Sequence, residues 1–379
     1  MSIRLNEALY GARRSAIREF SALAKATPGC ISLTLGEPEF DTPSPVRAAA
    51  AEALERSETH YIPNNGVTAL LEKISDYARR QDGLDYDPGE IIVTAGATEA
   101  LFVALFGILN PGDEVIIPVP AFVLYAEIVK LCRAVPVLYD TAPDGFQIDP
   151  ARFAAAVTPR TKAVILNSPN NPTGCIYTRE SLDAVRAAVA DRPVFVVCDE
   201  VYRRLCYGED CPSLAADPAL REKLLVVQSF SKPWAMTGWR MGWLLADAAV
   251  KERLELLHQY MVVSTPAPFQ RAAMAALDED PAPMRETYRR RRDETLRRLR
   301  TMGLDVTKPE GAFYVFPSIA KFGLDSAEFC RRMIREAGVA ATPGVCFGGE
   351  GYIRLSYCCA DALLAEGLDR LQAFINTLS

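Results

Sequence analysis

Short apolar runs alternate with helical segments from about residue 89 to about residue 270, and this alternation constrains the fold more than any other feature. The runs are rich in Val, Ile and Leu: EIIVTAG, EVIIPVP, AVPVLYD, AVILNSP, VFVVCDE and LLVVQSF. Nearly continuous apolar strands are typical of parallel sheets covered on both faces, and alternation with helices indicates βαβ units. We therefore predict an α/β fold with a mostly parallel, doubly wound sheet.

The length of the chain, 379 residues, exceeds the size at which a single core stops growing. After a charged helical segment at 281–300, the pattern changes to the short strands GAFYVFP and GYIRLSY and to amphipathic helices. The last helix places five apolar residues on one face: Leu364, Leu368, Leu371, Ile375 and Leu378. We predict a large domain at 46–280, a smaller α+β domain at 281–379, and an N-terminal arm at 1–45, with a helix at about 12–26, that packs with the smaller domain.

The composition limits the class of protein. Hydrophobic residues make up 49% and charged residues 24%, as in soluble globular proteins, and no apolar run reaches the roughly 18 residues that a membrane span requires. The N-terminal segment has no apolar signal region, so we expect a cytoplasmic protein. The ten cysteines show no C-x-x-C pair, and we expect reduced, mostly buried thiols.

Charge and histidine content exclude further classes. The net charge of −6 argues against nucleic-acid binding, which needs clustered positive charge. The arginine run at 289–292 is the exception, and we interpret it as a solvated helix face. The chain has only two histidines, His60 and His258, which argues against histidine metal sites and Ser-His triads. We interpret both as surface or packing residues and expect no metal.

Ligands of open α/β sheets bind beyond the carboxyl ends of the strands, and four strand ends carry polar residues. In the first, EIIVTAG runs into the helical segment ATEALFVALFGIL. Free backbone N–H groups at the helix start, with the hydroxyl of Thr98, would form a phosphate cradle. The alternative is a simple glycine turn, because neither a P-loop nor G-x-G-x-x-G is present.

The next two strand ends supply an amide and an acid. In AVILNSPNNPTG, Asn171 could donate a hydrogen bond while the prolines stiffen the loop, although an ordinary Asn/Pro turn would read the same way. In VFVVCDEVY, five apolar residues lead to Asp199, and Tyr202 follows about one turn later. A buried carboxylate needs a cation or a strong donor, such as a protonated ring nitrogen. The alternative for Asp199 is a helix N-cap.

The fourth strand end is SFSKPWAMTGWRMGW, residues 229–243. Lysine forms Schiff bases, and its amine must be neutral to attack, so Lys232 needs a pKa well below its usual value. We expect the cation of Arg240 and apolar surroundings to lower this pKa, the apolar residues being Phe230, Trp234 and Met236. Without its context, Lys232 would read as a surface lysine.

Arg240 also suits a phosphate dianion, and Ser229 and Ser231 could add hydroxyl donors. The four strand ends together offer a phosphate cradle, a buried acid, an amide donor, a phenol and a Schiff-base lysine. Pyridoxal phosphate has a phosphate, a pyridine nitrogen, a phenolic oxygen and an aldehyde. The sequence therefore predicts that the cofactor is pyridoxal 5′-phosphate.

With these motifs in place, the sequence resembles the class I/II aminotransferases, which are pyridoxal-phosphate enzymes of fold type I in the aspartate aminotransferase superfamily. The resemblance covers nearly the whole chain through SLTLGEPEFDTP, HYIPNNG, TAGATEAL, NSPNNPTG, CDEVY, SFSKPWAMTGWRMGW, PEGAFY and YIRLSY. It implies a large cofactor-binding domain with a mostly parallel sheet and a smaller α+β domain. The combination of SFSK-x8-R with NNPTG and DEVY is very specific.

The resemblance implies roles for the strand-end residues. Lys232 would form the internal aldimine, Asp199 would pair with the pyridine N–H, and Tyr202 and Asn171 would bond the ring oxygen O3′. Phe122 would stack on the ring, at a position where relatives more often carry Tyr or Trp, so a polar group is lost there. The cofactor phosphate would be held by Gly96, Ala97, Thr98, Ser229, Ser231 and Arg240.

The resemblance also implies partners. Tyr61 would reach the cofactor phosphate of a neighbouring subunit, so we expect a homodimer with shared active sites. Arg354 and Gly36, with help from Asn171, would bind the α-carboxylate of the substrate. Side chains alternate along the strand YIRLSY, so Arg354 points to the face opposite that of Ile353 and Leu355. The guanidinium of an arginine can bind a carboxylate through two hydrogen bonds. The alternative for Arg354 is a surface arginine on a strand.

We predict an aminotransferase that moves the amino group of an L-amino acid to a 2-oxo acid, with 2-oxoglutarate as the expected acceptor. A β-eliminating C–S lyase is the alternative with the same cofactor, and a non-catalytic ligand sensor of the same fold is a remote one. Some aspartate-using relatives carry a lysine where this chain has Thr98. Tyr10, Tyr125 and the loop at 261–269 would suit a medium apolar, aromatic or sulfur-containing substrate side chain.

Overall fold

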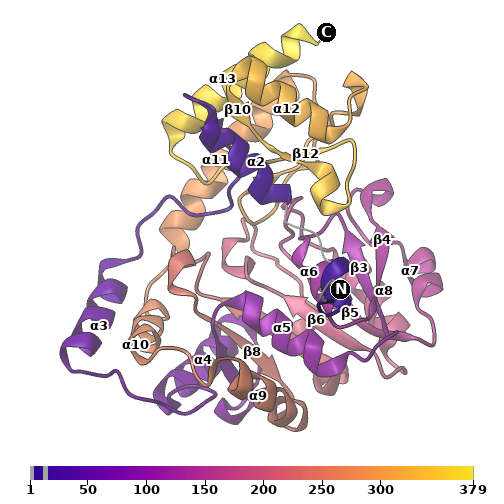
Figure 1. The fold of residues 1–379 in the computed structure, drawn as a ribbon. Helices are drawn as coiled ribbons and strands as arrows, with labels where there is room; N and C mark the ends of the chain where they lie inside the picture. Colours follow the sequence, from indigo (N-terminus) through magenta and orange to yellow (C-terminus); the bar gives the residue numbers. More distant parts are fainter. Residues whose placement is uncertain (1–3, 12–15, 379) are drawn as a thin grey trace.

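A seven-stranded sheet forms the centre of the larger part of the molecule (Figure 1). The computed structural model describes residues 4–11 and 16–378. The strands lie in the order β2 (Ile91–Thr94), β8 (Gly242–Ala246), β7 (Leu224–Ser229), β6 (Phe195–Asp199), β5 (Thr161–Asn167), β3 (Glu114–Val119) and β4 (Val135–Asp140). Only β8 is antiparallel to its neighbours, so the mostly parallel α/β sheet predicted from the sequence is confirmed.

Helices cover both faces of this sheet, because successive residues of a strand point to opposite faces and both sets are apolar. Ile92 packs into one core, and its neighbours Ile91 and Val93 pack into the other. One face carries α5 (Ala97–Ile108), α6 (Leu124–Leu131) and α9 (Ala248–Val262). The opposite face carries α3 (Ser44–Glu55), α4 (Thr68–Asp82), α7 (Pro150–Ala156), α8 (Arg179–Val189) and α10 (Ala267–Ala276).

The C-terminal part forms a second core above the sheet in the view of Figure 1. Its small antiparallel sheet has the order β11 (Thr342–Pro343), β12 (Ile353–Ser356) and β9 (Tyr314–Val315). Its helices are α11 (Ala282–Thr301), α12 (Ser326–Ala337) and α13 (Asp361–Thr377). The apolar face expected for the last helix is present for four of its five residues, since Leu364, Leu368, Leu371 and Ile375 of α13 are buried. Leu378 follows the last residue of the helix and is only partly buried.

The N-terminal segment packs on this C-terminal core. The short strand β1 (Ile31–Ser32) pairs in parallel with β10 (Val339–Ala340), and Phe20 and Ala24 of α2 (Ala16–Ala26) lie in the same core. A further short helix, α1 (Ala8–Gly11), contacts α6 of the larger part. Residues 12–15 of the helix predicted from the sequence lie outside the described residues.

The expectation that the arginine run is a solvated face is wrong for two of its four members. Arg291 and Arg292 are only 7% and 5% exposed, because they lie on the face of α11 that also buries Tyr288, Thr295 and Leu299. Arg291 pairs with Glu39 and with Asp361, and Arg292 pairs with Asp293 and the carbonyl of Pro309. Buried guanidinium groups need such partners.

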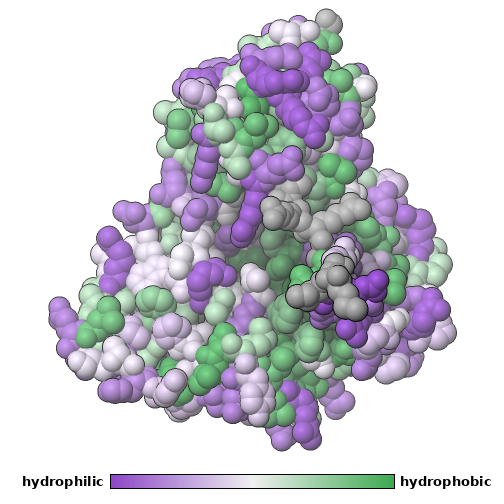
Figure 2. Space-filling model, in the orientation of Figure 1, coloured by the Kyte–Doolittle hydropathy of each residue, from purple (hydrophilic) through white to green (hydrophobic). Residues whose placement is uncertain are grey.

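The expectation of uniformly reduced cysteines is also corrected, because the structure joins Cys206 and Cys211 in a disulfide. The other eight cysteines are free, and five of these are buried. Within the described part of the chain, no helix is long and apolar enough to cross a membrane. Figure 2 shows apolar side chains lining a hollow between the C-terminal part and the larger part below it.

Candidate active site

The topology of the large sheet brings the predicted functional residues to one edge. Strands β2, β5, β6 and β7 are mutually parallel, so their carboxyl ends, which carry Asn167, Asp199 and Ser229, meet there. Strand β8 runs the other way and begins at this same edge, so Arg240, two residues before it, arrives beside them. This one antiparallel strand explains how a residue that precedes a strand joins residues that follow strands.

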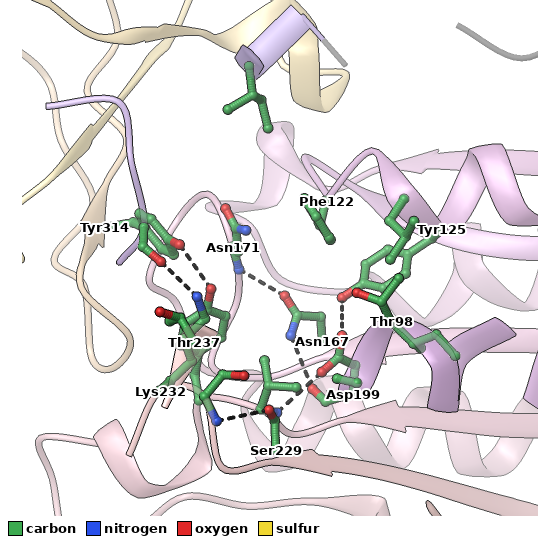
Figure 3. Close-up of a pocket in the computed structure, with 18 of the residues that line it drawn as sticks. Thr98, Phe122, Tyr125, Asn167, Asn171, Asp199, Ser229, Lys232, Thr237 and Tyr314 are labelled. Carbon is green, nitrogen blue, oxygen red and sulfur yellow. Dashed lines mark hydrogen bonds between the residues drawn. The ribbon is translucent and has the colours of Figure 1, made fainter. Parts of the chain in front are cut away.

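A cavity between this edge and the C-terminal part gathers most of the predicted site (Figure 3). Its lining includes the predicted residues Gly36, Ala97, Thr98, Phe122, Asn171, Asp199, Tyr202, Ser229, Ser231, Lys232, Arg240 and Arg354. Gly96 caps the start of α5 immediately beside this lining. Tyr61 is the exception and lies elsewhere. Among the described residues, no cluster of His, Cys, Asp or Glu could hold a metal ion.

The N-terminus of α5 and Arg240 form a cationic corner of the cavity. Gly96 has φ of +78°, and a Cβ built on it would lie 2.5 Å from Nη2 of Arg240, so only glycine permits this approach. The Arg240 Nη1 donates to the carbonyl of Thr237 at 2.9 Å. The free N–H groups of a helix start and a guanidinium together favour a dianion.

Asp199 is 3% exposed at the end of β6, and burial raises its pKa to about 6, above its ordinary value near 3.8. Two hydrogen bonds act in the opposite direction. The hydroxyl of Tyr125 donates to Oδ2 at 2.5 Å, and the backbone N–H of Val201 donates to Oδ1 at 3.2 Å. A buried carboxylate of this kind is stabilised by a cationic partner on its cavity side.

Lys232 is half-buried in the cavity wall, and burial lowers the pKa of its amine to about 8. The cations of Arg354 and Arg240 act in the same direction, whereas Cys358 and Glu37 oppose it. Its Nζ donates to the carbonyl of Gly36 at 2.7 Å. A substantial fraction of this amine is therefore neutral near pH 8, as a nucleophile requires.

The apolar surroundings of Lys232 differ from those expected. Phe230, Trp234 and Met236 belong to the core on the far face of the sheet. The aromatic rings near the Lys232 amine are instead Tyr202 and Phe313, whose ring centres lie 6.0 and 5.8 Å from Nζ. The sequence motif therefore anchors the lysine loop in the core, while residues from other segments enclose the amine.

Arg354 projects into the cavity from β12 and is 2% exposed. Its Nη1 donates to Oδ1 of Asn171 at 2.8 Å, and its Nη2 donates to the carbonyl of Thr34. Its Nε has no hydrogen-bond partner, although it is buried. A buried N–H donor without a partner is costly, so this atom favours a ligand oxygen.

Tyr202 and Phe122 complete the walls. The hydroxyls of Tyr202 and Tyr314 lie 2.9 Å apart, and a Cβ on Gly36 would lie 1.7 Å from the hydroxyl oxygen of Tyr314. Gly36 therefore lets the N-terminal loop pass directly over Tyr314. Phe122 faces the cavity from the segment before α6 and packs edge-on against Tyr125 at 6.0 Å.

Three parts of the predicted site do not line this cavity: Tyr61, Tyr10 and the loop at 261–269. Tyr61 is 91% exposed, and it lines a second hollow, around residues 59–62 and 262–268, which includes much of the 261–269 loop. Tyr10 is 66% exposed and does not line the cavity. Tyr125 does line it, but its hydroxyl is bonded to Asp199 and is therefore not a free contact for a substrate side chain.

Asn167 and Thr34 are site residues that the sequence reasoning missed. The amide of Asn167 donates to the carbonyl of Asp199 at 3.1 Å and accepts from the backbone N–H of Asn171 at 2.8 Å, so it joins two strand ends. Its position at the end of the AVILN run was a usable signal. No local signal marked Thr34, because its role depends on the distant Arg354.

The donor set fits pyridoxal 5′-phosphate. The cavity has a cationic corner for a phosphate at α5, a buried carboxylate for a ring nitrogen at Asp199, and an amine of lowered pKa at Lys232. The buried Nε of Arg354 has no partner, and Gly96 lets the guanidinium of Arg240 approach the start of α5; both features favour a bound anion.

Comparisons with known proteins agree with this geometry. The family model "Aminotransferase class I and II" matches residues 28–371. The chain is 42% identical to a probable N-acetyl-LL-diaminopimelate aminotransferase of Bacillus subtilis, covering 95% of this chain and 93% of the relative. It is 38% identical to aromatic-amino-acid aminotransferase 2 of Thermococcus litoralis, covering 98% of each. The structure of Thermus thermophilus aspartate aminotransferase with maleate superposes with a TM-score of 0.93 at 36% identity, covering 98% and 100% of the two chains.

The fold, the cavity and these matches define an enzyme of pyridoxal-phosphate fold type I. Within that class, the chain belongs to the class I and II aminotransferases, so the protein is a transaminase whose cofactor is pyridoxal 5′-phosphate. The resemblance predicted from the sequence motifs is confirmed.

Proposed function

We propose that the protein transfers the amino group of an L-amino acid to a 2-oxo acid, with Lys232 as the catalytic amine and 2-oxoglutarate as the acceptor. One observation carries the proposal. The amine of Lys232, with a pKa lowered to about 8, lines the same cavity as the buried carboxylate of Asp199 and the partly unpaired guanidinium of Arg354. Transamination needs a nucleophilic amine, an acid that keeps the cofactor ring nitrogen protonated, and a group that binds the substrate carboxylate.

The cofactor roles follow from the positions of these groups. When bound, pyridoxal phosphate supplies an aldehyde that forms an imine with an amine and a ring that withdraws electrons from the substrate α-carbon. We assign the phosphate to Gly96, Ala97, Thr98, Ser229, Ser231 and Arg240, the ring nitrogen to Asp199, the phenolic oxygen to Tyr202 and Asn171, and the ring face to Phe122. Each of these except Gly96 lines the cavity.

Lys232 and Asp199 perform the proton and charge work. Lys232 is assigned as the base that removes the substrate α-proton and as the acid that returns a proton, because its lowered pKa makes both protonation states accessible. Asp199 holds a proton on the ring nitrogen through its buried carboxylate. The hydrogen bond from Tyr125 keeps that carboxylate ionised against the effect of burial.

Arg354 and the apolar wall define the substrate. The guanidinium, with Gly36 and Asn171, is assigned to the α-carboxylate. The other cations in the described lining are Lys232 and Arg240, which both have cofactor roles. A cation for a second carboxylate, such as the distal one of 2-oxoglutarate, would therefore come from outside this lining, for example from the partner subunit. Ile17, Leu35 and Leu124 line the remaining wall. These features support a donor with a medium apolar, aromatic or sulfur-containing side chain.

The proposed active unit is a homodimer with shared sites. Tyr61 and Tyr260 are 91% and 84% exposed, and Leu54, Met261 and Val263 are exposed near them in the chain. An exposed apolar surface of this kind is typical of an interface. We assign Tyr61 to the cofactor phosphate of the partner subunit, which is consistent with its position outside the cavity of its own chain.

The test is a donor panel. Purified holoenzyme is given each L-amino acid with 2-oxoglutarate or with pyruvate, whose methyl group needs no second cation, and loss of the donor is followed. We expect leucine-, methionine- or phenylalanine-like donors to react faster than aspartate, and Lys232→Ala to abolish turnover. Release of pyruvate from cystathionine without an acceptor would instead support the lyase alternative. Full turnover by Lys232→Ala would refute the assignment of this residue.

A further inference from the structure

Glu99 and His258 form a buried pair behind the cavity that the catalytic scheme does not use. His258 is fully buried on α9, and Glu99 is 7% exposed in the first turn of α5. Nδ1 of His258 lies 2.7 Å from Oε1 of Glu99, and Nε2 lies 2.8 Å from the carbonyl oxygen of Asn64. The other carboxylate oxygen of Glu99 accepts the backbone N–H of Ala95 at 2.5 Å.

The two contacts of the His258 ring determine how many protons the pair holds. A backbone carbonyl only accepts hydrogen bonds, so Nε2 of His258 must carry a hydrogen and donate it to Asn64. The Nδ1–Glu99 contact then also needs a proton, which belongs to the imidazole or to the carboxyl. In either case the pair shares one proton more than a neutral histidine beside an ionised glutamate would have, and it carries no net charge.

One end of this pair contacts the turn before α5, which is proposed to hold the phosphate of its own site. The other end contacts the segment that carries Tyr61, which is proposed to reach the phosphate of the partner subunit. Ala95 immediately precedes Gly96, which caps α5 beside Arg240. Asn64 lies three residues after Tyr61, and its side chain donates to the carbonyl of Val263 at the end of α9 at 2.7 Å. The next residue, Asn65, accepts the backbone N–H of Val93 in β2 at 2.9 Å.

We propose that Glu99 and His258 are positioning residues for the cofactor phosphate: they hold the Ala95–Gly96 turn to the segment that carries Tyr61, and the proton that they share leaves no uncompensated negative charge next to the phosphate site. The inference rests on the proposed function, since it takes the start of α5 and Tyr61 as the phosphate contacts. A carboxylate that has lost its proton-sharing partner would repel a phosphate dianion and would no longer fix the turn.

The experiment compares ligands that differ only in the phosphate. Binding of pyridoxal phosphate and of pyridoxal to each apoenzyme is measured by the absorbance change on binding. Two variants each keep one hydrogen bond: His258→Gln places a donor near Asn64, and His258→Asn places one near Glu99. We expect each to weaken pyridoxal-phosphate binding on the order of tenfold, with pyridoxal binding changed by less than about twofold.

Two further variants serve as controls. Glu99→Gln can still accept from Ala95 and can donate to a neutral Nδ1, so it should retain most of the phosphate preference. Lys251→Leu lies two turns earlier on α9, where Lys251 pairs with Glu255, and should leave both affinities as in the wild type. Thermal unfolding of every apoenzyme identifies a variant that has lost its fold, in which case the other His258 variant carries the test.

The outcomes separate the two ideas. Wild-type protein that binds neither ligand would overturn the proposed function and this inference with it. Wild-type binding together with His258 variants that bind pyridoxal phosphate equally well would overturn the inference alone. So would an equal loss for both ligands, because that result would show general loosening of the large domain and no specific effect on the phosphate.

Discussion

At the scale of single residues, the site depends on buried groups whose ionisation is shifted in opposite senses. Burial raises the pKa of Asp199 to about 6 and lowers the pKa of Lys232 to about 8, so each charged form is less favoured than it is in water. Both shifts are unfavourable to the apoenzyme. A bound cofactor that pairs with Asp199 and reacts with Lys232 removes both, so we expect cofactor binding to stabilise the fold.

Asp199→Asn should make the apoenzyme more stable at neutral pH while it abolishes transamination. The pKa of Asp199 is raised in the folded state, so the native protein binds more protons than the unfolded chain between about pH 4 and pH 6, and its stability falls as pH rises through that window. At pH 7 the substitution removes a penalty of up to about 3 kcal/mol. Urea unfolding of both apoenzymes at pH 7 and below pH 4 measures the difference, which should vanish at the lower pH.

The matched control for this prediction is Asp76→Asn. Asp76 forms an exposed ion pair with Arg80 on α4, and removing it should change stability by less than about 1 kcal/mol. An Asp199→Asn apoenzyme that is less stable than the wild type at pH 7 would contradict the argument. That result would mean that the hydrogen bonds from Tyr125 and Val201 outweigh the effect of burial.

At this scale, the sequence did not reveal the roles of residues whose partners are distant in the chain. Asp199 and Lys232 could be recognised because each follows an apolar run. Tyr125, in contrast, was expected to contact the substrate side chain, because its hydrogen bond to Asp199 spans 74 positions and has no local signal. Arg291 and Arg292 read as solvated because most of their partners are contributed by other segments. Glu39 and Asp361 pair with Arg291, and the carbonyl of Pro309 accepts a hydrogen bond from Arg292.

At the scale of elements, one edge of the large sheet holds the site residues that follow the parallel strands and precede β8. Six of its seven strands could be predicted from apolar runs between helices. Strand β8 was missed, because an antiparallel return after the lysine loop has no local signature and depends on pairing with Gln228 and Val93. That missed strand is the element that delivers Arg240 to the site.

Gly96→Ala should weaken cofactor binding at the start of α5 by tenfold or more. The new Cβ would lie 2.5 Å from Nη2 of Arg240, and the residue would be strained at φ of +78°. Arg240 would have to move from the position proposed for the phosphate. Equilibrium titration of the apoenzyme with pyridoxal phosphate measures the effect.

Gly112→Ala controls for backbone strain alone. Gly112 has φ of +88°, but no atom lies within 4 Å of the position of its Cβ. This variant should lose about 1 kcal/mol of stability and keep its cofactor affinity. Equal cofactor losses in the two variants would show that strain in the large domain, and not the contact with Arg240, is responsible.

At the scale of the whole molecule, the cavity lies between the sheet edge and the C-terminal part, and a proposed second subunit completes it. The division at residues 45 and 280 stays a prediction, as do the dimer and the individual residue roles. The two cores themselves are visible in the structure: one lies around the sheet and the other around α11, α12 and α13.

Mixed dimers test the shared site. If Tyr61 serves the partner subunit, a hybrid of a Lys232→Ala subunit and a Tyr61→Phe subunit contains one site with both native groups. We expect Tyr61→Phe homodimers to bind the cofactor more weakly, and the hybrid to recover one site of wild-type affinity. Hybrids isolated with two different affinity tags are titrated with pyridoxal phosphate. Monomeric wild-type protein in sedimentation, or hybrids no better than the Tyr61→Phe homodimer, would contradict the shared site.

The pairing of β1 with β10 has a mechanical consequence. The backbone N–H of Leu33 donates to Ala340, and the carbonyl of Thr34 accepts a hydrogen bond from Arg354. The N-terminal segment is therefore joined to the C-terminal part, and this one unit carries both Gly36 and Arg354. If this unit moved as a whole, the contacts of Gly36 and Arg354 with a carboxylate would stay the same, and only the distance from these contacts to Asp199 would change. The distance between the carboxylate contacts and the edge of the large sheet, rather than the shape of either, would then determine which substrates fit.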